Sequence, residues 1–300
     1  MPEIVKNCPM CNSDLSKLFD SRTFVGKVVE NQICRSCGFV FQSPRMTSQE
    51  ADSFYASEYR RLYQGSSGPN PKDLRMQELR ADSLAAYAGG HIKNVSRHLD
   101  IGCSAGLLMK SINRTFDCET VGIEPGQAYR EYAIESGLKI FTSLIELQTD
   151  CDDRFDLVTM SHVLEHLPDP CQYLQHLREE VLSVDGCLLL EVPNLYAHDS
   201  FEIAHLSSFS LHTMRQLVRM AGFELIAYHK HGFPRSRVIP YFLTVLCCPS
   251  SSSSQNKVKK ERFVSLKRRL GLLRRRVLSR IFPSLAWKPL DVEKDQGSTS

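Results

Sequence analysis

The sequence lacks any apolar run that approaches the roughly 20 residues needed to span a bilayer. Its first residues, MPEIVKNCPMC, contain no apolar core of the kind that directs secretion. We therefore expect a cytoplasmic protein. The 300 residues also contain no internal repeat, and this length suits one large domain or a domain with appendages.

A second absence concerns residues 93–248, where predicted strands and helices alternate and indicate a doubly wound α/β sheet. The predicted strands include CLLLEVPN, residues 187–194, and RVIPYFLTVLCC, residues 237–248, is a further candidate. Nicotinamide-binding folds of this kind carry G-x-G-x-x-G in the first strand–helix turn. Here that turn reads LDIGCSAGLL, residues 99–108, and has no G-x-G, which argues against a dinucleotide. Gly102 and Gly106 still let a ligand approach the backbone without a Cβ in the way.

Two acidic residues stand at predicted strand ends near this turn. Asp100 can accept a hydrogen bond from a ligand amine, directly or through water. Glu124, in VGIEP, ends the next strand, where a carboxylate suits a bidentate grip on the hydroxyls of a ribose. The alternative for both is helix capping and surface charge.

Cysteine, in contrast, is abundant, with eleven residues, although a chain without an export signal is not expected to build a disulfide framework. The motifs CPMC and CRSC each fit a turn that points two thiolates at one metal ion. Gly26 lies between them in a predicted hairpin. Residues 1–45 are therefore predicted to form a zinc ribbon with a structural zinc ion bound by Cys8, Cys11, Cys34 and Cys37, the alternative being four unrelated thiols. Most of the other seven cysteines are expected to be small core residues.

Together, LDIGCSAG, VGIEP, FDLVTMSHVLEHLPDP and LLLEVPN resemble the class I S-adenosylmethionine-dependent methyltransferases. Ser104 stands where the family's D-x-G-x-G-x-G turn has its middle glycine. The resemblance implies a Rossmann-like seven-stranded sheet with S-adenosylmethionine as the methyl donor. It also implies a set of cofactor-binding residues, namely Asp100, Gly102, Cys103, Gly106, Glu124, Pro125 and His162.

The segments CRSCGFVFQSPR, FYASEY and HLSSFSLHTMRQLVRMAGFEL resemble a subset of this family that carries an N-terminal zinc-binding module. Many members of that subset act on sugars in surface-polysaccharide or deoxysugar pathways. The resemblance covers about residues 1–245. Residues 46–92 are expected to form a helical linker or lid, in which Tyr55 and Tyr59 either fold over the donor or belong to a plain amphipathic helix.

The stretch HVLEH, residues 162–166, also matches the H-x-x-E-H signature of some zinc peptidases. It follows a predicted buried strand directly, and Pro168 and Pro170 come at once after it. The stretch can therefore form at most about one helical turn, which argues against a peptidase site.

Methyl transfer to a hydroxyl group needs a base that accepts the proton. The candidates are His162, Glu165, His166 and His205. By resemblance, His162 lies near the donor and His205 lies on the segment that caps the acceptor pocket, so we favour His205 as the base. Glu165 and His166 are expected to be structural, and a hydrogen bond to backbone is the alternative role for His205.

Residues 249–300 form a serine-rich linker and a basic tail in which apolar residues recur at helical spacing. The tail could be a solvated helix, an interfacial helix on an acidic membrane, or a binder of nucleic acid or an acidic glycan. The apolar stripe favours peripheral membrane contact through residues 257–288, at the inner face of the membrane. The few aromatic residues argue against nucleic acid.

The sequence as a whole predicts a methyltransferase whose acceptor is a saccharide or another small molecule. The alternatives are a methyltransferase of a quinone-like phenol or a tRNA base, and a non-catalytic zinc-ribbon protein that binds nucleic acid.

Overall fold

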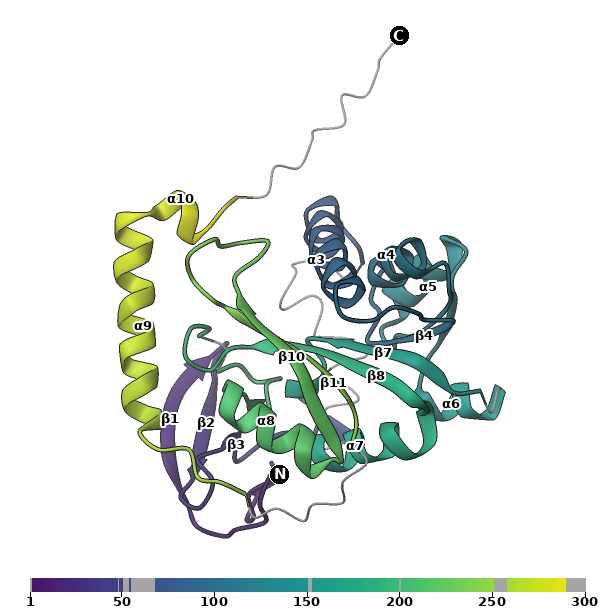
Figure 1. Cartoon of the computed structure of the whole chain (residues 1–300). Helices are drawn as coiled ribbons and strands as arrows, with labels where there is room; N and C mark the ends of the chain where they lie inside the picture. The colour runs from purple at the N-terminus through teal and green to yellow at the C-terminus, as the bar shows by residue number, and fades with distance from the viewer. Residues whose placement is uncertain are drawn as a thin grey trace.

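The computed structural model describes residues 2–47, 49–50, 54, 68–150, 153–199, 201–250 and 258–289. A central twisted sheet has helices on both faces, and a smaller sheet built from the N-terminal segment stands beside it (Figure 1). The two tyrosines predicted to form a lid, Tyr55 and Tyr59, lie outside the described residues.

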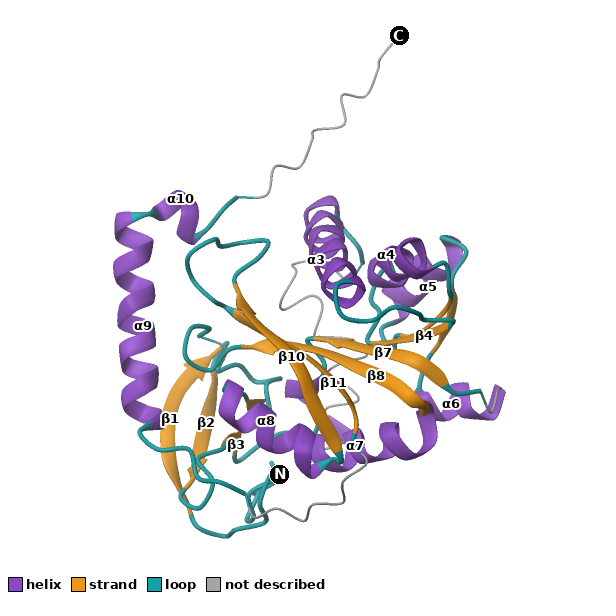
Figure 2. Cartoon of the chain, in the orientation of Figure 1, coloured by secondary structure: helices purple, strands orange, loops and turns teal. Residues whose placement is uncertain are grey.

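The central sheet has seven strands in the order β10-β11-β8-β7-β4-β5-β6 (Figure 2). Strands β4 to β8 run parallel, whereas β11 pairs antiparallel with both β8 and β10. The strand order reverses between β4 and β7, which is where open α/β sheets bind ligands. The predicted seven-stranded, doubly wound sheet is thus confirmed. The strands are β4 (Arg97–Ile101), β5 (Glu119–Ile123), β6 (Lys139–Phe141), β7 (Phe155–Ser161), β8 (Leu182–Pro193), β10 (Phe223–His231) and β11 (Phe242–Pro249).

Helices cover both faces of this sheet, and side chains cap several of their first turns. Asn70 accepts a hydrogen bond from the backbone N–H of Asp73, and Ser210 forms a capping box with Thr213. One face is covered by α3 (Pro71–Gly89), α4 (Leu107–Phe116) and α5 (Gln127–Glu135). The other face is covered by α6 (Leu144–Asp150), η1 (Leu164–His166), α7 (Pro170–His176), η2 (Leu177–Val181) and α8 (Leu211–Met220).

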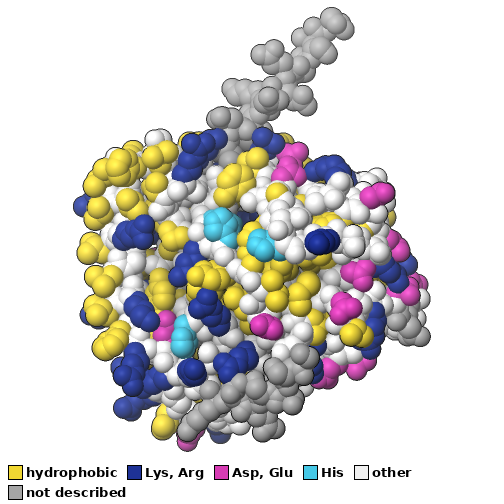
Figure 3. Space-filling model, viewed as in Figure 1, with side chains coloured by type: hydrophobic (Ala, Val, Ile, Leu, Met, Phe, Trp, Pro, Cys, Tyr) yellow, Lys and Arg dark blue, Asp and Glu magenta, His cyan; other side chains and the backbone are white. Residues whose placement is uncertain are grey.

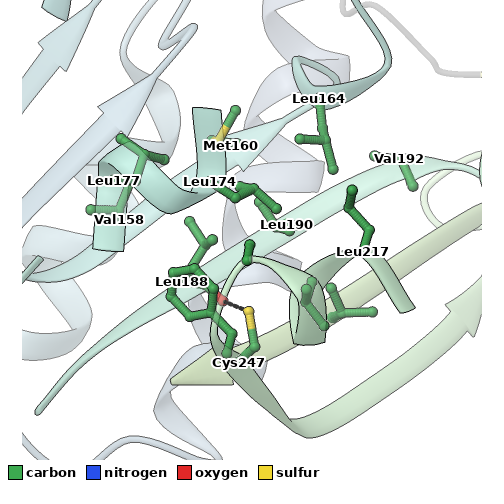
Figure 4. Close-up of a cluster of buried hydrophobic side chains, with 14 of the residues drawn as sticks. Val158, Met160, Leu164, Leu174, Leu177, Leu188, Leu190, Val192, Leu217 and Cys247 are labelled. Carbon is green, nitrogen blue, oxygen red and sulfur yellow. Dashed lines mark hydrogen bonds between the residues drawn. The ribbon is translucent and has the colours of Figure 1, made fainter. Parts of the chain in front are cut away.

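The core forms because successive residues of a strand point to opposite faces of the sheet. Along β8, Leu188 and Leu190 join one buried cluster, whereas Leu189 joins the other with α3 and α4. Figure 4 shows the first cluster, in which β7 and β8 pack against η1, α7, η2 and α8. The Cys247 thiol also donates a hydrogen bond to the backbone oxygen of Leu188, at 3.5 Å.

The N-terminal segment forms the hairpin of β1 (Ser16–Phe24) and β2 (Lys27–Cys34), as predicted for the ribbon. Val25 and Gly26 both have positive φ, the conformation that suits a two-residue hairpin turn. Strand β3 (Val40–Gln42) and the two-residue β9 (Ser207–Ser208) complete a four-stranded sheet in the order β1-β2-β3-β9. The ribbon sheet therefore ends on a strand from the segment that precedes α8.

The basic C-terminal segment forms α9 (Val264–Ile281) and the short α10 (Pro283–Ala286). In Figure 1, α9 stands upright beside β1 and β2. The backbone N–H of Glu261 donates to the backbone oxygen of Cys37, at 2.8 Å, so the segment touches the ribbon directly. The predicted basic helix is thus present, and it packs on the body of the molecule. Among the helices of the described residues, none is long and apolar enough to cross a membrane.

Two expectations need correction. Cys187 and Cys248 belong to the seven cysteines of which most were expected to be small core residues, but they form a disulfide that joins β8 to β11. Strand β8 was expected to begin at Cys187, but it begins at Leu182, because the preceding helical turn ends at Val181.

Candidate active site

The turn between β4 and α4 adopts a backbone that only small residues accommodate. Gly102 and Gly106 have φ values of +75° and +74°, in the left-handed region that glycine tolerates best. A Cβ on Gly102 would lie 2.5 Å from Cγ2 of Val163, and one on Gly106 would collide with Leu138. Ser104, at the position of the family's middle glycine, is also left-handed, with φ 52°. The two glycines therefore allow Val163 and Leu138 to pack closely on the turn, and Ser104 keeps the glycine-like conformation.

Glu124 closes over this turn from the end of β5. Its two carboxylate oxygens accept hydrogen bonds from the backbone N–H groups of Ser104, at 2.9 Å, and Gly126, at 2.8 Å. The residue is buried. A carboxylate oxygen can accept more than one hydrogen bond, so these two bonds are compatible with contact to ribose hydroxyls. The carboxylate thus fits the predicted role.

Asp100 lies inside the sheet at the end of β4. It is buried and accepts a hydrogen bond from the Thr159 hydroxyl at 2.6 Å. Burial raises the pKa of Asp100 to about 7; the Thr159 bond opposes this rise and the charge of Glu124 adds to it. A cationic ligand group nearby would favour the ionised form.

The two other predicted cofactor contacts flank this pair. Cys103 is buried, and its backbone N–H donates to the backbone oxygen of Ile123 at 3.0 Å. Pro125 is exposed, and its carbonyl accepts a hydrogen bond from Arg130 at 2.7 Å. Both residues lie beside Glu124, and their contacts with a cofactor remain predictions.

His162 follows β7 and lies next to the turn through its neighbour Val163. It has φ 57° and a partly exposed side chain. Nδ1 lies 3.2 Å from Glu165 Oε1, and Nε2 lies 3.4 Å from Glu191 Oε1. Burial and the charge of Arg80 lower the pKa of His162, but the two carboxylates outweigh them and raise it above its usual value.

Glu191, on β8, is the centre of a buried polar cluster. Its carboxylate pairs with Arg80 and with His231, each at 3.1 Å, and accepts a hydrogen bond from Thr244 at 3.1 Å. Burial alone would raise the pKa of Glu191, yet the bonds from His162 and His231 and the charge of Arg80 hold it well below the usual value. Glu191 is therefore a fixed negative charge behind His162.

His205 lies on the other side of Glu165. A carboxylate oxygen of Glu165 and one ring nitrogen each of His166 and His205 all lie within 4.8 Å of one another. The centroids of the two histidine rings are 4.9 Å apart. Nε2 of His205 lies 3.9 Å from Glu202 Oε2. Both candidate bases, His162 and His205, thus border the same buried carboxylate. The charges and hydrogen bonds of the histidines overcome burial and lower the pKa of Glu165 to about 2.

The peptidase interpretation of HVLEH finds no support in this geometry. Residues Leu164–His166 form one short helical turn, so the two histidines do not share a continuous helix. His166 uses Nδ1 to donate a hydrogen bond to the backbone oxygen of Ala204, at 2.8 Å. His162 directs its Nδ1 to Glu165 instead.

Residues 73–228, more than half of the chain, match the model of a family described as a methyltransferase domain. The chain belongs to this family. It is 31% identical over 130 residues to the ubiquinone biosynthesis O-methyltransferase of Actinobacillus pleuropneumoniae serotype 5b (strain L20), a match that covers 40% of this chain and 54% of that protein. The protein of the same name from Erwinia tasmaniensis is 35% identical over 102 residues, covering 32% and 41%. The chain therefore spans about half the length of the curated relatives it matches.

Solved structures show the same fold. The 1,6-didemethyltoxoflavin-N1-methyltransferase of Burkholderia thailandensis, solved with S-adenosylhomocysteine, superposes with a TM-score of 0.56 at 14% identity, over 77% of this chain and 99% of that chain. The plantazolicin methyltransferase BpumL, also with S-adenosylhomocysteine, gives a TM-score of 0.51 at 15% identity, over 67% and 93%. At these identities the likeness concerns the fold alone.

The cysteine cluster of this methyltransferase-domain protein lies outside the matched residues. Cys8 Sγ is 3.7 Å from Cys37 Sγ, and Cys11 Sγ is 3.5 Å from Cys34 Sγ. The four sulfur atoms all lie within 4.8 Å of one another. Tetrahedral zinc with Zn–S bonds of about 2.3 Å separates its sulfur ligands by about 3.8 Å. The predicted ligand set therefore has the spacing that a structural zinc ion needs.

Sequence reasoning missed several residues of the polar cluster, notably Arg80, Glu191, His198 and His231. His198 packs near Phe242, with ring centroids 5.9 Å apart, and burial lowers its pKa to about 3. One signal could have revealed Glu191, because a lone carboxylate in the apolar strand LLLEVPN must find a buried partner. A cavity of 580 Å³ lies elsewhere, lined by Val28, Val29 and Gln42 of the ribbon together with Arg45, Phe54 and Ile203.

Proposed function

We propose that the protein is an S-adenosylmethionine-dependent methyltransferase that methylates a hydroxyl group of a small molecule or saccharide. The observation that carries this proposal is the direct contact between the turn at 102–106 and the segment at 162–166. A Cβ on Gly102 would reach Val163, so the turn and the histidine–carboxylate cluster share one edge of the sheet. That edge is the reversal point between β4 and β7, where a donor and an acceptor can meet.

The cofactor would be held by the turn and its two carboxylates. Glu124 offers its carboxylate to the ribose hydroxyls, and Asp100 offers a buried acceptor to a cationic amine. Gly102 and Gly106 give the turn its left-handed backbone and let Val163 and Leu138 pack directly against it. When bound, S-adenosylmethionine supplies an electrophilic methyl group on a sulfonium that is a good leaving group.

His162 is the proton acceptor that this geometry supports best. Its side chain is partly exposed, and Glu165 orients Nδ1 as a carboxylate orients the histidine of a hydrolase. Glu165 and Glu191 stabilise the imidazolium form of His162; because Nε2 is buried against Glu191, a substrate hydroxyl reaches it only by displacing that contact. His205, which we favoured from the sequence, lies across Glu165 and remains the second candidate.

Two acceptor classes are proposed. The zinc ribbon that precedes the methyltransferase domain favours a saccharide, by resemblance to the sugar-modifying subset. The similarity to proteins named ubiquinone biosynthesis O-methyltransferase favours a quinone-like phenol instead. A phenol ionises far more readily than a sugar hydroxyl, so it depends less on a strong base.

Label transfer from radioactive S-adenosylmethionine to nucleotide sugars, lipid-linked glycans and dihydroxybenzoate-type phenols would separate these acceptors. Calorimetry should show binding of S-adenosylmethionine and S-adenosylhomocysteine. Glu124→Gln should abolish this binding, whereas Glu119→Gln, at the exposed opposite end of β5, should preserve it. If neither ligand binds the wild-type protein, the proposal is wrong.

The role of His162 can be tested separately. His162→Gln should lower kcat by about 10²–10⁴-fold while the donor still binds. Because Glu165 helps to raise the pKa of His162, Glu165→Gln should shift the acid limb of the kcat–pH profile to lower pH. An unshifted limb in Glu165→Gln, together with full activity of His162→Gln, would transfer the role to His205.

A further inference from the structure

Helix α9 is held against the molecule by its inner side. Arg268 is buried, and it donates hydrogen bonds to the backbone oxygens of Leu195 and His198. Its guanidinium also lies 4.0 Å from the centre of the Phe201 ring. Gly271 sits so close to Tyr196 that a Cβ there would collide with the Tyr196 carbonyl oxygen. This close approach fixes which side of the helix faces inward.

The start of the helix is fixed by a buried carboxylate. Glu261 accepts hydrogen bonds from the hydroxyls of Tyr196 and Ser210, both at 2.6 Å, and pairs with Lys267 at 3.1 Å. Farther along, Arg275 lies over the ring of Tyr241 at 5.1 Å. Helix α9 is therefore held in place by specific contacts, which also fix its rotation about its own axis.

The opposite side of α9 presents an apolar stripe to solvent. Its residues recur three or four positions apart, the spacing that places side chains on one helix face. In a helix that packs into a core such a stripe would be buried, but here each side chain is about half exposed. The relative exposures are Leu266 54%, Leu270 56%, Leu273 54%, Val277 43% and Ile281 61%. Figure 3 shows these hydrophobic side chains as a yellow column along the edge of the molecule.

Basic residues border this stripe on both sides. With about 100° of rotation per residue, Arg269, Arg276 and Arg280 lie on one flank, and Lys267 and Arg274 lie on the other. The sequence contains no acidic residue from 262 to 289.

Exposed aromatic residues stand at both ends of the stripe. Phe263 precedes the helix, and Phe282 and Trp287 follow it. Aromatic rings are enriched where proteins meet the boundary between lipid and water. An apolar face with cationic borders and aromatic ends is the pattern of a helix that lies in a membrane interface.

We propose that α9 docks the protein on an anionic lipid bilayer, with the stripe inserted among the acyl chains and the flanking cations on the headgroups. A second copy of the chain is a poorer partner, since pairing the stripes would bring the basic flanks together. Nucleic acid is a poorer partner too, because it offers no apolar surface to the five aliphatic side chains. This docking does not depend on methyl transfer, and its test contains no methyl donor.

The test is flotation of the full-length protein with vesicles of phosphatidylcholine alone or mixed with phosphatidylglycerol. We expect binding to the anionic vesicles that weakens as salt rises. The double variant Leu270→Gln/Leu273→Gln should lower binding about tenfold or more, because it removes apolar groups that insert. The triple variant Arg269→Gln/Arg276→Gln/Arg280→Gln should lower it by about fivefold per charge.

Val184→Gln is the matched control, because this apolar residue is 88% exposed on β8, away from α9. It should bind vesicles like the wild type. Thermal unfolding should be unchanged in all the variants, since their side chains face solvent. Equal binding by the leucine variant and the wild type would overturn the proposal. A concentration-dependent dimer that the leucine variant abolishes would also overturn it. So would a wild-type protein that binds RNA but no vesicles, if only the arginine variant loses the RNA binding.

Discussion

Replacing Gly102 with alanine tests the contact on which the proposed site depends. At φ +75° a residue with a Cβ costs about 1–2 kcal/mol more than glycine. The new Cβ would also lie 2.5 Å from Cγ2 of Val163, closer than real side chains approach. Since Val163 is β-branched and stiff at χ1, relieving the clash requires the backbone to move and costs about 1–3 kcal/mol more. We therefore expect Gly102→Ala to lower the free energy of unfolding by about 2–5 kcal/mol.

Two further variants separate the two costs. Gly137→Ala is the matched control, because Gly137 has φ +84° and open space around its Cβ position. It should show the backbone cost alone, of about 1–2 kcal/mol. Val163→Ala removes the clashing carbon atom, so it should destabilise Gly102→Ala much less than it destabilises the wild type.

Urea unfolding of the four proteins in this double-mutant cycle measures the coupling, and calorimetry with S-adenosylhomocysteine measures the effect on ligand binding. A coupling energy of about 1–3 kcal/mol between positions 102 and 163 is expected. If the two substitutions are additive, the turn and the HVLEH segment are not in contact, and the argument for a shared active site is refuted.

Three other predictions follow from the same structure. Burial raises the pKa of Asp100 from 3.8 to about 7, so the stability it contributes is full below about pH 4 and is lost as the pH rises through 7. Asp100→Asn should flatten the pH dependence of ligand-free unfolding over this range, and an unchanged curve would contradict the burial of an ionisable group there. Metal analysis should find one zinc ion per chain, and Cys34→Ser should remove it and lower the melting temperature; zinc-free wild-type protein would disprove the ribbon site. Ser104→Gly should raise the free energy of unfolding by about 0.5–1 kcal/mol, because it relieves a left-handed serine; a loss of stability would show that the serine side chain contributes more than its backbone costs.

The sequence predicted the central sheet well because local patterns encode it. Alternating strands and helices fix a parallel, doubly wound arrangement, and β11 overlaps the candidate segment RVIPYFLTVLCC, residues 237–248, and ends one residue beyond it. The turn glycines were identified by the same local reasoning, and both have the positive φ values that explain their presence. The start of β8 was missed because residues 182–186 look like the end of a helix followed by a turn.

The missed features depend on contacts between distant residues. Cys187 and Cys248 are 61 positions apart and meet only because β8 pairs with β11. Likewise, nothing in the local sequence announces that Glu191 would meet both Arg80 and His231. Periodicity reports which face of an element is apolar, and it cannot report which partner that face meets.

The basic tail is another segment whose partners could not be predicted from its periodicity. Its helical period and its charges were plain from the sequence, whereas its fixed rotation depends on Arg268 and Gly271 meeting residues 195–198. The apolar stripe faces solvent because Arg268 and Gly271, on the opposite face of α9, pack against residues 195–198.

The pairing of β9 with β3 joins the cysteine-containing ribbon to the segment that carries His205. Phe41 pairs with Ser207 and Val40 with Ser208, two and three residues beyond His205. A zinc ion bound by the four thiols, as we predict, would therefore stabilise both the ribbon and the strand that follows this histidine. Removal of that ion is then expected to disorder the segment around His205, while the turn at 102–106, in the other sheet, keeps its conformation.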